Sequence, residues 1–182
     1  MQGATIRRSS VVVTHTTRSC PEIQALLKSL DAQRSHILDM VDGLDAKDLR
    51  RPVLPSGWSC LGLVQHLALD VERFWFRAVM TGDTSVIDAL GDIDDAWQVA
   101  PDVPPAEVLD RYRRETDLSN SAVTVTTPDT PLVWWPHHLF GEPHLHTVRD
   151  VLLHVITETA CHAGHLDAAR ELIDGRRRLV LT

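Results

Sequence analysis

Apolar residues recur at intervals of three and four positions in four long segments of the chain. The segments are residues 20–42, 59–80, 105–118 and 147–174. This interval is the repeat of an α-helix that buries one face, so each segment is predicted to form an amphipathic helix. Alternation of apolar and polar residues, the pattern of a half-buried strand, is almost absent. The pattern therefore predicts an all-α fold, a four-helix bundle.

Residues at the ends of the segments support these helices. Ser59 is a suitable N-cap for the second helix, and Pro105 suits the first turn of the third. The Ser/Thr/Pro-rich stretch 119–131 is expected to end the third helix. Thr147 and Asp150 form a capping box at the start of the fourth helix.

The segments between the predicted helices are long, irregular connections. Residues 1–18, which are rich in Thr, Ser and Arg without helical periodicity, are predicted to be a flexible N-terminal arm. Residues 19–182 are predicted to form one bundle domain. A chain of 182 residues with 43% hydrophobic content is long enough for one domain with a sizeable core.

Charge and composition exclude several classes of partner. The net charge is -7, because 25 Asp and Glu outnumber 18 Lys and Arg, so phosphate backbones and anionic lipid surfaces would be repelled. No apolar stretch approaches the roughly 20 residues that cross a bilayer. We therefore expect a cytoplasmic protein without a nucleic-acid or membrane partner. The three cysteines have no CxxC spacing, which argues against a disulfide framework and a thiolate zinc site.

The stretch "HVITETACHAGH" in the fourth helix carries candidate chemistry. At about 100° per residue, His154, Glu158, His162 and His165 share a helix face about 80° wide. The same face carries Val151, Val155, Ala169, Leu172 and Ile173. We therefore expect this face to point into the bundle, where a buried carboxylate and imidazoles need partners. Hydrogen bonds to neighbouring helices would satisfy them; a shared metal ion is the interpretation that we favour.

Helix geometry limits which of these residues share one ion. A rise of about 1.5 Å per residue places His154 and His162 about 12 Å apart along the axis, too far for a common ion. The possible pairs are Glu158 with His162, His154 with Glu158, and His162 with His165.

A third ligand should come from another helix, and the second helix offers His66. The helical wheel places His66 at the border of the apolar stripe, where a position on the solvated face is equally consistent with the pattern. Asp70, one turn further on, would orient the His66 ring as a carboxylate partner.

The motifs "GWS", "LGLVQHL" and "ERFWF" in the second helix, with "LLHVITETACHAGHLDAARELIDG" in the fourth, resemble the DinB/YfiT-like superfamily of metal-binding four-helix bundles. Within it, they resemble most closely the mycothiol-transferase branch, over about residues 20–175. The resemblance implies a divalent metal, expected to be zinc, with nickel, iron or manganese as alternatives. It implies His66, Glu158 and His162 as ligands.

Two further positions follow from the same resemblance. His165 is expected to be a catalytic residue that supports the ligands, or an occasional fourth ligand; in the alternative of a metal-assisted hydrolase, His165 or His154 would carry the proton. Members of the branch often carry an arginine immediately before the second histidine ligand, where this chain has Cys161. Cys161 lies on the flank of the ligand face, from which it could reach the pocket; packing is the interpretation that we favour.

The resemblance implies a metal-dependent thiol S-transferase, or a thiol-dependent isomerase. Such an enzyme uses a low-molecular-weight thiol, mycothiol or a similar one, against small electrophiles. Three ligands leave coordination positions open, and an open divalent ion acidifies a bound thiol. A metal-assisted hydrolase and a non-enzymatic metal-binding stress protein are the alternatives. A homodimer is implied by the resemblance alone.

The segment "WWPHHLFGEPHLH", residues 134–146, precedes the fourth helix. We expect it to line the mouth of the site, with Trp134 and Trp135 supplying apolar walls for the bound small molecules. Metal binding by its histidines is the alternative. Cys60, in the first turn of the second helix, is interpreted as a small buried hydrophobe rather than a nucleophile.

Overall fold

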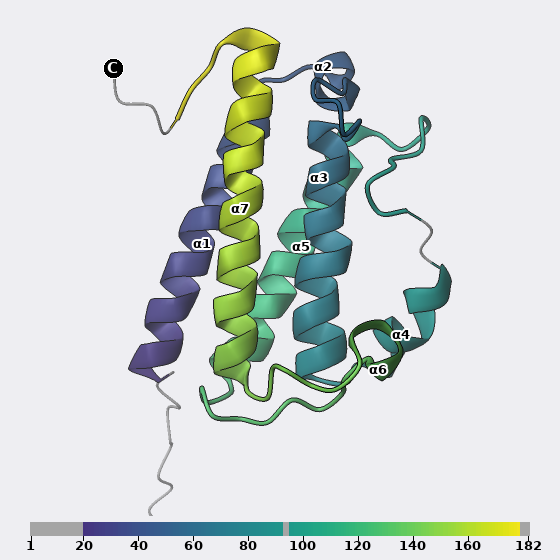
Figure 1. Ribbon diagram of the computed structural model, residues 1–182. Helices are drawn as coiled ribbons and strands as arrows, with labels where there is room; N and C mark the ends of the chain where they lie inside the picture. Colours follow the sequence, from purple (N-terminus) through teal and green to yellow (C-terminus); the bar gives the residue numbers. More distant parts are fainter. Residues whose placement is uncertain (1–19, 93–94, 179–182) are drawn as a thin grey trace, which may run out of the picture.

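The predicted four-helix bundle is confirmed. The computed structural model describes residues 20–92 and 95–178, so the predicted arm, residues 1–18, lies outside the described residues. Figure 1 shows the long helices side by side. They are α1 (Pro21–Val41), α3 (Cys60–His66) with its continuation η1 (Leu67–Met80), α5 (Pro105–Thr124) and α7 (Val148–Asp174).

The directions of the helices explain why one connection is so long. In Figure 1, α1 and α7 run in one direction, whereas α3–η1 and α5 run in the opposite one. Since η1 and α5 are consecutive and parallel, the connection 81–104 returns along the length of the bundle. It carries the short helix α4 (Thr84–Asp88) and the 3₁₀ turn η2 (Ala89–Asp92).

Gln65 of α3 anchors the returning connection. Its Nε2 donates hydrogen bonds to the carbonyl oxygens of Ala96 at 3.0 Å and of Gln98 at 3.1 Å. Trp97 lies between these two anchors and is thereby held against α3. Two other short helices, α2 (Ala46–Arg50) and α6 (His137–Phe140), lie at opposite ends of the bundle (Figure 1).

Most helix ends agree with the sequence, and the end of α5 does not. The hydroxyl of Ser59 accepts a hydrogen bond from the backbone N–H of Gly62, and Thr147 forms the expected capping box. However, α5 continues to Thr124. Its serines donate back to carbonyls one turn earlier, Ser119 to Glu115 at 2.9 Å, so their side chains are satisfied within the helix.

The helix that begins as α3 changes its winding at Leu67. The sequence predicts a single α-helix to residue 80, whereas η1 (Leu67–Met80) is π-helical, a form in which each backbone donor reaches five residues back. Nearly every side chain of η1 is buried. Its three partly exposed residues, Asp70, Arg73 and Arg77, keep the spacing of an ordinary amphipathic α-helix, so the sequence does not indicate the change of winding.

A buried ion pair links α1 to η1. Arg34 donates to both carboxylate oxygens of Glu72, at 2.7 and 2.6 Å, and the two residues are only 4% and 1% exposed. Arg34 also donates to Asn120 of α5 at 2.7 Å. The pair therefore fixes three helices in one arrangement. Among the described residues, no helix combines the length and the apolar character needed to cross a membrane.

Candidate metal centre and active site

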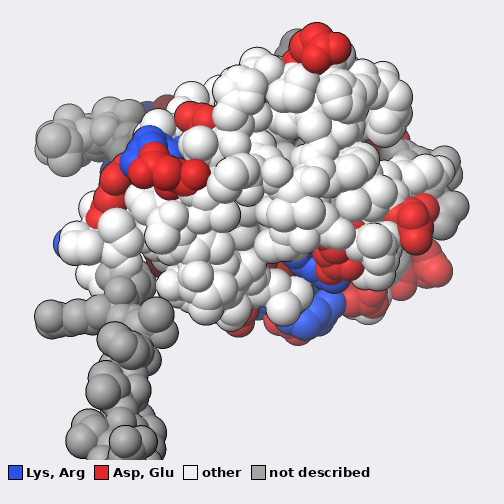
Figure 2. All heavy atoms as spheres, turned by 90° about the horizontal axis from the view of Figure 1, so that it is seen from below, with Lys and Arg blue, Asp and Glu red and all other residues white. Residues whose placement is uncertain are grey.

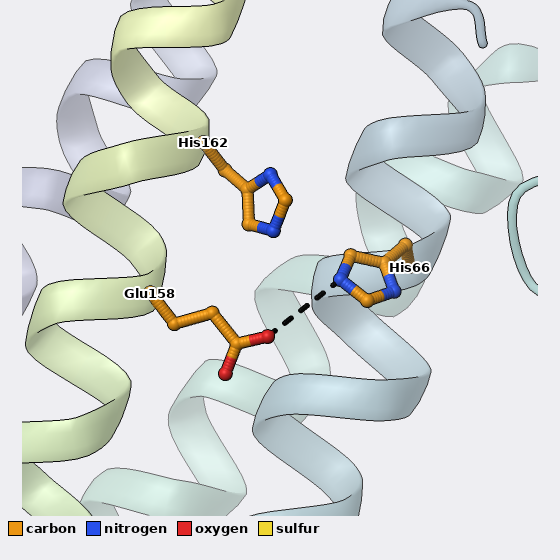
Figure 3. Close-up of side chains that lie close together, drawn as sticks. All are labelled: His66, Glu158 and His162. Carbon is orange, nitrogen blue, oxygen red and sulfur yellow. Dashed lines mark ion pairs between the residues drawn. The ribbon is translucent and has the colours of Figure 1, made fainter. Parts of the chain in front are cut away.

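Three side chains from two helices converge beside η1. Figure 3 shows His66, at the end of α3, facing Glu158 and His162 of α7. Nε2 of His66 lies 3.8 Å from Oε1 of Glu158, and the rings of His66 and His162 are 5.0 Å apart. One donor atom of each residue lies within 4.8 Å of the other two. The pair Glu158 and His162, one of the three pairs that the spacing allows, thus meets His66.

The face of α7 that carries these residues is less buried than expected. The buried stripe of the helix consists of Val148, Val151, Leu152, Val155, Thr159, Ala163, Leu166, Ala169 and Arg170. Glu158 and His154 lie on its flank, with side chains 26% and 35% exposed, and Leu172 is 57% exposed. Because α7 packs chiefly against α1, its flank borders η1 only along one edge. That edge leaves room for an open cavity.

Asp70 orients the His66 ring. Nδ1 of His66 lies 2.9 Å from Oδ2 of Asp70, and since a carboxylate oxygen accepts, Nδ1 carries the hydrogen. The lone pair of Nε2 then faces Glu158. This is the contact that the sequence predicts, and it prepares the ring to act as a ligand.

Trp97 holds the other side of the His66 ring, a contact that the sequence does not predict. The two rings stack with centroids 4.2 Å apart and an interplanar angle of 17°. Trp97 comes from the long connection, in which no periodic pattern marks it. Its only signal is that it is a tryptophan in a polar, acidic segment.

Two further histidines of α7 flank the triad. Nε2 of His154 lies 3.1 Å from Oε2 of Glu158, so His154 holds the carboxylate oxygen that faces away from His66. Nδ1 of His165 lies 3.5 Å from Nδ1 of His162. His165 is exposed and does not line the cavity, so its predicted catalytic role stays a prediction.

Protonation states favour cation binding. Burial raises the pKa of Glu158, but the His154 hydrogen bond and the nearby imidazoles outweigh it, so the pKa lies below its ordinary value. Burial, reinforced by His66, lowers the pKa of His162 to about 4. At neutral pH, Glu158 is therefore ionised and His162 neutral, the states in which these groups bind metals. The donor set fits a divalent ion.

A cavity of about 500 Å³ opens beside the triad. One wall is polar and the other is aromatic. The lining residues are His66, Asp70, Phe74, Trp75, Phe140, His154, Thr157, Glu158, Cys161 and His162. The expectation that Cys161 serves packing is wrong, because it is exposed at this cavity. Cys60 is buried as expected, and burial raises the pKa of its thiol to about 11.

Trp134 and Trp135 do not line this cavity. Trp134 packs on Phe74, with ring centroids 6.4 Å apart, and Trp135 packs on Phe140 at 6.0 Å. They thus support the aromatic wall from behind and line a separate cavity of about 210 Å³. Phe140, from the same segment, is the residue that reaches the site. Among the described residues, the histidines of 134–146 form no cluster of three ligands.

Comparison of the sequence with protein families matches residues 25–175 to the family described as Mycothiol-S-transferase. Comparisons with curated proteins and with solved structures give no match. The matched range contains every residue that lines the cavity.

Proposed function

Because the chain belongs to the mycothiol S-transferase family, we propose that it is a metal-dependent thiol S-transferase whose ion is held by His66, Glu158 and His162. The convergence of three donor atoms within 4.8 Å beside an open cavity carries this proposal. Family membership supports a low-molecular-weight thiol, mycothiol or a similar one, as the co-substrate. We propose zinc as the ion, with nickel, iron or manganese as alternatives that the donor types permit.

A divalent ion in this position supplies Lewis acidity that lowers the pKa of a thiol. The protein supplies orientation. Asp70 and Trp97 fix the His66 ring, and His154 holds the second oxygen of Glu158. No protein nucleophile is needed, because the thiol comes with the co-substrate. We propose that His165 assists catalysis from beside the cavity by orienting the His162 ring, since Nδ1 of His165 lies 3.5 Å from Nδ1 of His162.

Metal analysis of purified variants tests the ligand set. We expect wild type and the control His138→Ala, which removes an exposed histidine outside the triad, to retain one equivalent of metal. His66→Ala and Glu158→Ala should lose it while keeping the far-UV circular dichroism of a helical bundle. Retention of metal by both triad variants with unchanged affinity would refute the site.

Activity assays then separate the function classes. Mycothiol with chlorodinitrobenzene tests thiol transfer, and a panel of esters and amides tests metal-assisted hydrolysis. Turnover of the thiol reaction that is lost in Glu158→Ala supports the proposal. Full metal loading with inertness toward both sets would contradict it and indicate a metal-binding protein without catalytic activity.

A further inference from the structure

We infer that the cavity selects an uncharged electrophile with a planar aromatic body, and that Phe74, Trp75 and Phe140 are the residues that select it. The inference deepens the proposed function and rests on it, because it names the second substrate of the same cavity. Two independent features of the lining carry it: the arrangement of the aromatic rings and the sign of the fixed charges.

The aromatic wall is a rigid surface. Phe74 and Trp75 of η1 meet edge to face, with ring centroids 5.0 Å apart and an interplanar angle of 87°. Phe140 of α6 stacks on Trp75 at 5.7 Å and 14°. Phe74 and Trp75 are buried, with 7% and 4% of their surface exposed, so neither ring is free to swing away. Rings held in this way favour stacking or edge contacts with another flat aromatic group.

The fixed charges of the lining are negative. Of the described lining residues, Asp70 and Glu158 carry a carboxylate and none is a lysine or arginine. A divalent ion on the triad would be balanced by these two carboxylates, and a thiolate would add one further negative charge. A negatively charged electrophile would therefore be repelled at the point of attack, whereas an uncharged one would not.

Exposed apolar residues lie on the surface beside Phe140. Phe140 lines the cavity and is 45% exposed, and Leu139 and Val133 nearby along the chain are exposed as well. Figure 2, which looks at the end of the bundle that carries α6, shows a patch without Lys, Arg, Asp or Glu that charged residues border on several sides. The aromatic surface thus continues from the cavity to the outside of the protein at Phe140, which favours contact with an uncharged aromatic compound.

The proposed reaction on such a compound needs no further reactant. With chlorodinitrobenzene, the thiol loses its proton to solvent and the sulfur lone pair forms a bond to the ring carbon. The electron pair of the carbon–chlorine bond leaves with chloride. The products are an aryl thioether, chloride and a proton.

Binding of unreactive rings tests the inference separately from catalysis. The binding of meta-dinitrobenzene and of dinitrobenzoate is compared by the quenching of tryptophan fluorescence. The measurement is made on the purified protein with its metal content determined, and again after the metal has been removed by a chelator. We expect the uncharged ring to bind at least about tenfold more tightly, a difference of about 1.4 kcal/mol. Equal or tighter binding of the carboxylate would overturn the inference, whatever the catalytic activity.

Substitutions in the cavity test which residues select the ring. Cys161→Arg places a positive charge on an exposed lining residue outside the triad, and should strengthen dinitrobenzoate binding about tenfold. Cys161→Gln, the uncharged control, should not. Phe140→Ala, on a half-exposed residue that the core does not need, should weaken binding of both rings. If Phe140→Ala and Trp75→Leu fold and bind both rings as wild type does, the aromatic wall has no selecting role.

Kinetics distinguish failure of this inference from failure of the proposed function. Rates with chlorodinitrobenzene, chlorodinitrobenzoate and chloroacetamide are each divided by the uncatalysed rate with the same thiol. The inference expects the largest acceleration for the uncharged aromatic compound. Preference for the carboxylate or for chloroacetamide would overturn the inference alone. Inertness toward all three would overturn the proposed function, while the binding comparison would still decide the charge and shape preference of the cavity.

Discussion

Gly62→Ala is expected to destabilise the protein, although alanine is the better helix former. Gly62 lies in α3, directly beneath the backbone of Trp97. A methyl group at Gly62 would lie 3.1 Å from the carbonyl carbon of Trp97 and closer still to its oxygen. The obstacle is backbone that Gln65 anchors on both sides, so it cannot move aside as a flexible side chain would.

The magnitude follows from comparison with a second helical glycine. Gly164 in α7 is exposed, and a methyl group there would meet no atom within 4 Å. Gly164→Ala should therefore show only the gain in helix propensity, about 1 kcal/mol. Gly62→Ala makes the same gain and adds an overpacking cost of about 1–3 kcal/mol. Since the gain is common to both, the two variants should differ in unfolding free energy by that cost.

Urea denaturation followed by far-UV circular dichroism measures both variants under one condition. We expect the midpoint to fall for Gly62→Ala relative to Gly164→Ala, with similar slopes. The displaced Trp97 should also leave the His66 ring, so Gly62→Ala should bind zinc more weakly than Gly164→Ala. Equal stabilisation by both substitutions would show that the connection yields to α3, and the account of Trp97 as a fixed support would be refuted.

Three other predictions concern stability, metal affinity and thiol reactivity. Glu72→Ala removes the carboxylate that pairs with the buried Arg34, which keeps only Asp31 and Asn120 as partners, and should lower the unfolding free energy by about 1–3 kcal/mol, whereas the exposed Glu107→Ala should change it by under about 0.5 kcal/mol; comparable midpoints in urea would contradict this. Asp70→Ala frees the imidazole that it orients and should weaken zinc binding about 10–100-fold, measured by competition with a chelating indicator; unchanged affinity would assign Asp70 no orienting role. In the folded protein, iodoacetamide should label the exposed Cys161. Cys60 should react only after unfolding, because burial raises the pKa of its thiol to about 11. Mass spectrometry that finds Cys60 labelled before Cys161 would contradict this order of reactivity.

The long helices could be predicted from the sequence because each buries one face. Their apolar residues must recur with the helical period, and caps such as Thr147 mark the ends. The end of α5 was missed because serine is ambiguous: it stops a helix or bonds back into it, according to what lies around it. The sequence does not predict the winding of η1, because its polar residues Asp70, Arg73 and Arg77 recur at the spacing of an ordinary α-helix.

The candidate site also has a part that could be predicted from the sequence and a part that could not. The spacing of Glu158 and His162 could be recognised within one helix, because residues four apart share a face. The same spacing within the second helix predicts the contact of Asp70 with His66, whereas the contributions of the connections could not be predicted. Trp97 and Phe140 reach the site because their connections follow particular paths over the bundle, and no local pattern encodes a path. The sequence predicts Trp134 and Trp135 at the cavity, whereas Phe140 of the same segment lines it, because the path of this segment is not encoded locally either.

The flank position of Glu158 and His162 on α7 has a consequence for evolution and for experiment. Since the residues that hold α7 in the bundle lie on a separate arc, the donors can be exchanged without loosening the scaffold. One frame can in this way host different sets of donors and different reactions. A single substitution of a donor should therefore give a folded, inactive protein. If it still binds its aromatic substrate, this variant is suited to crystallisation of the complex.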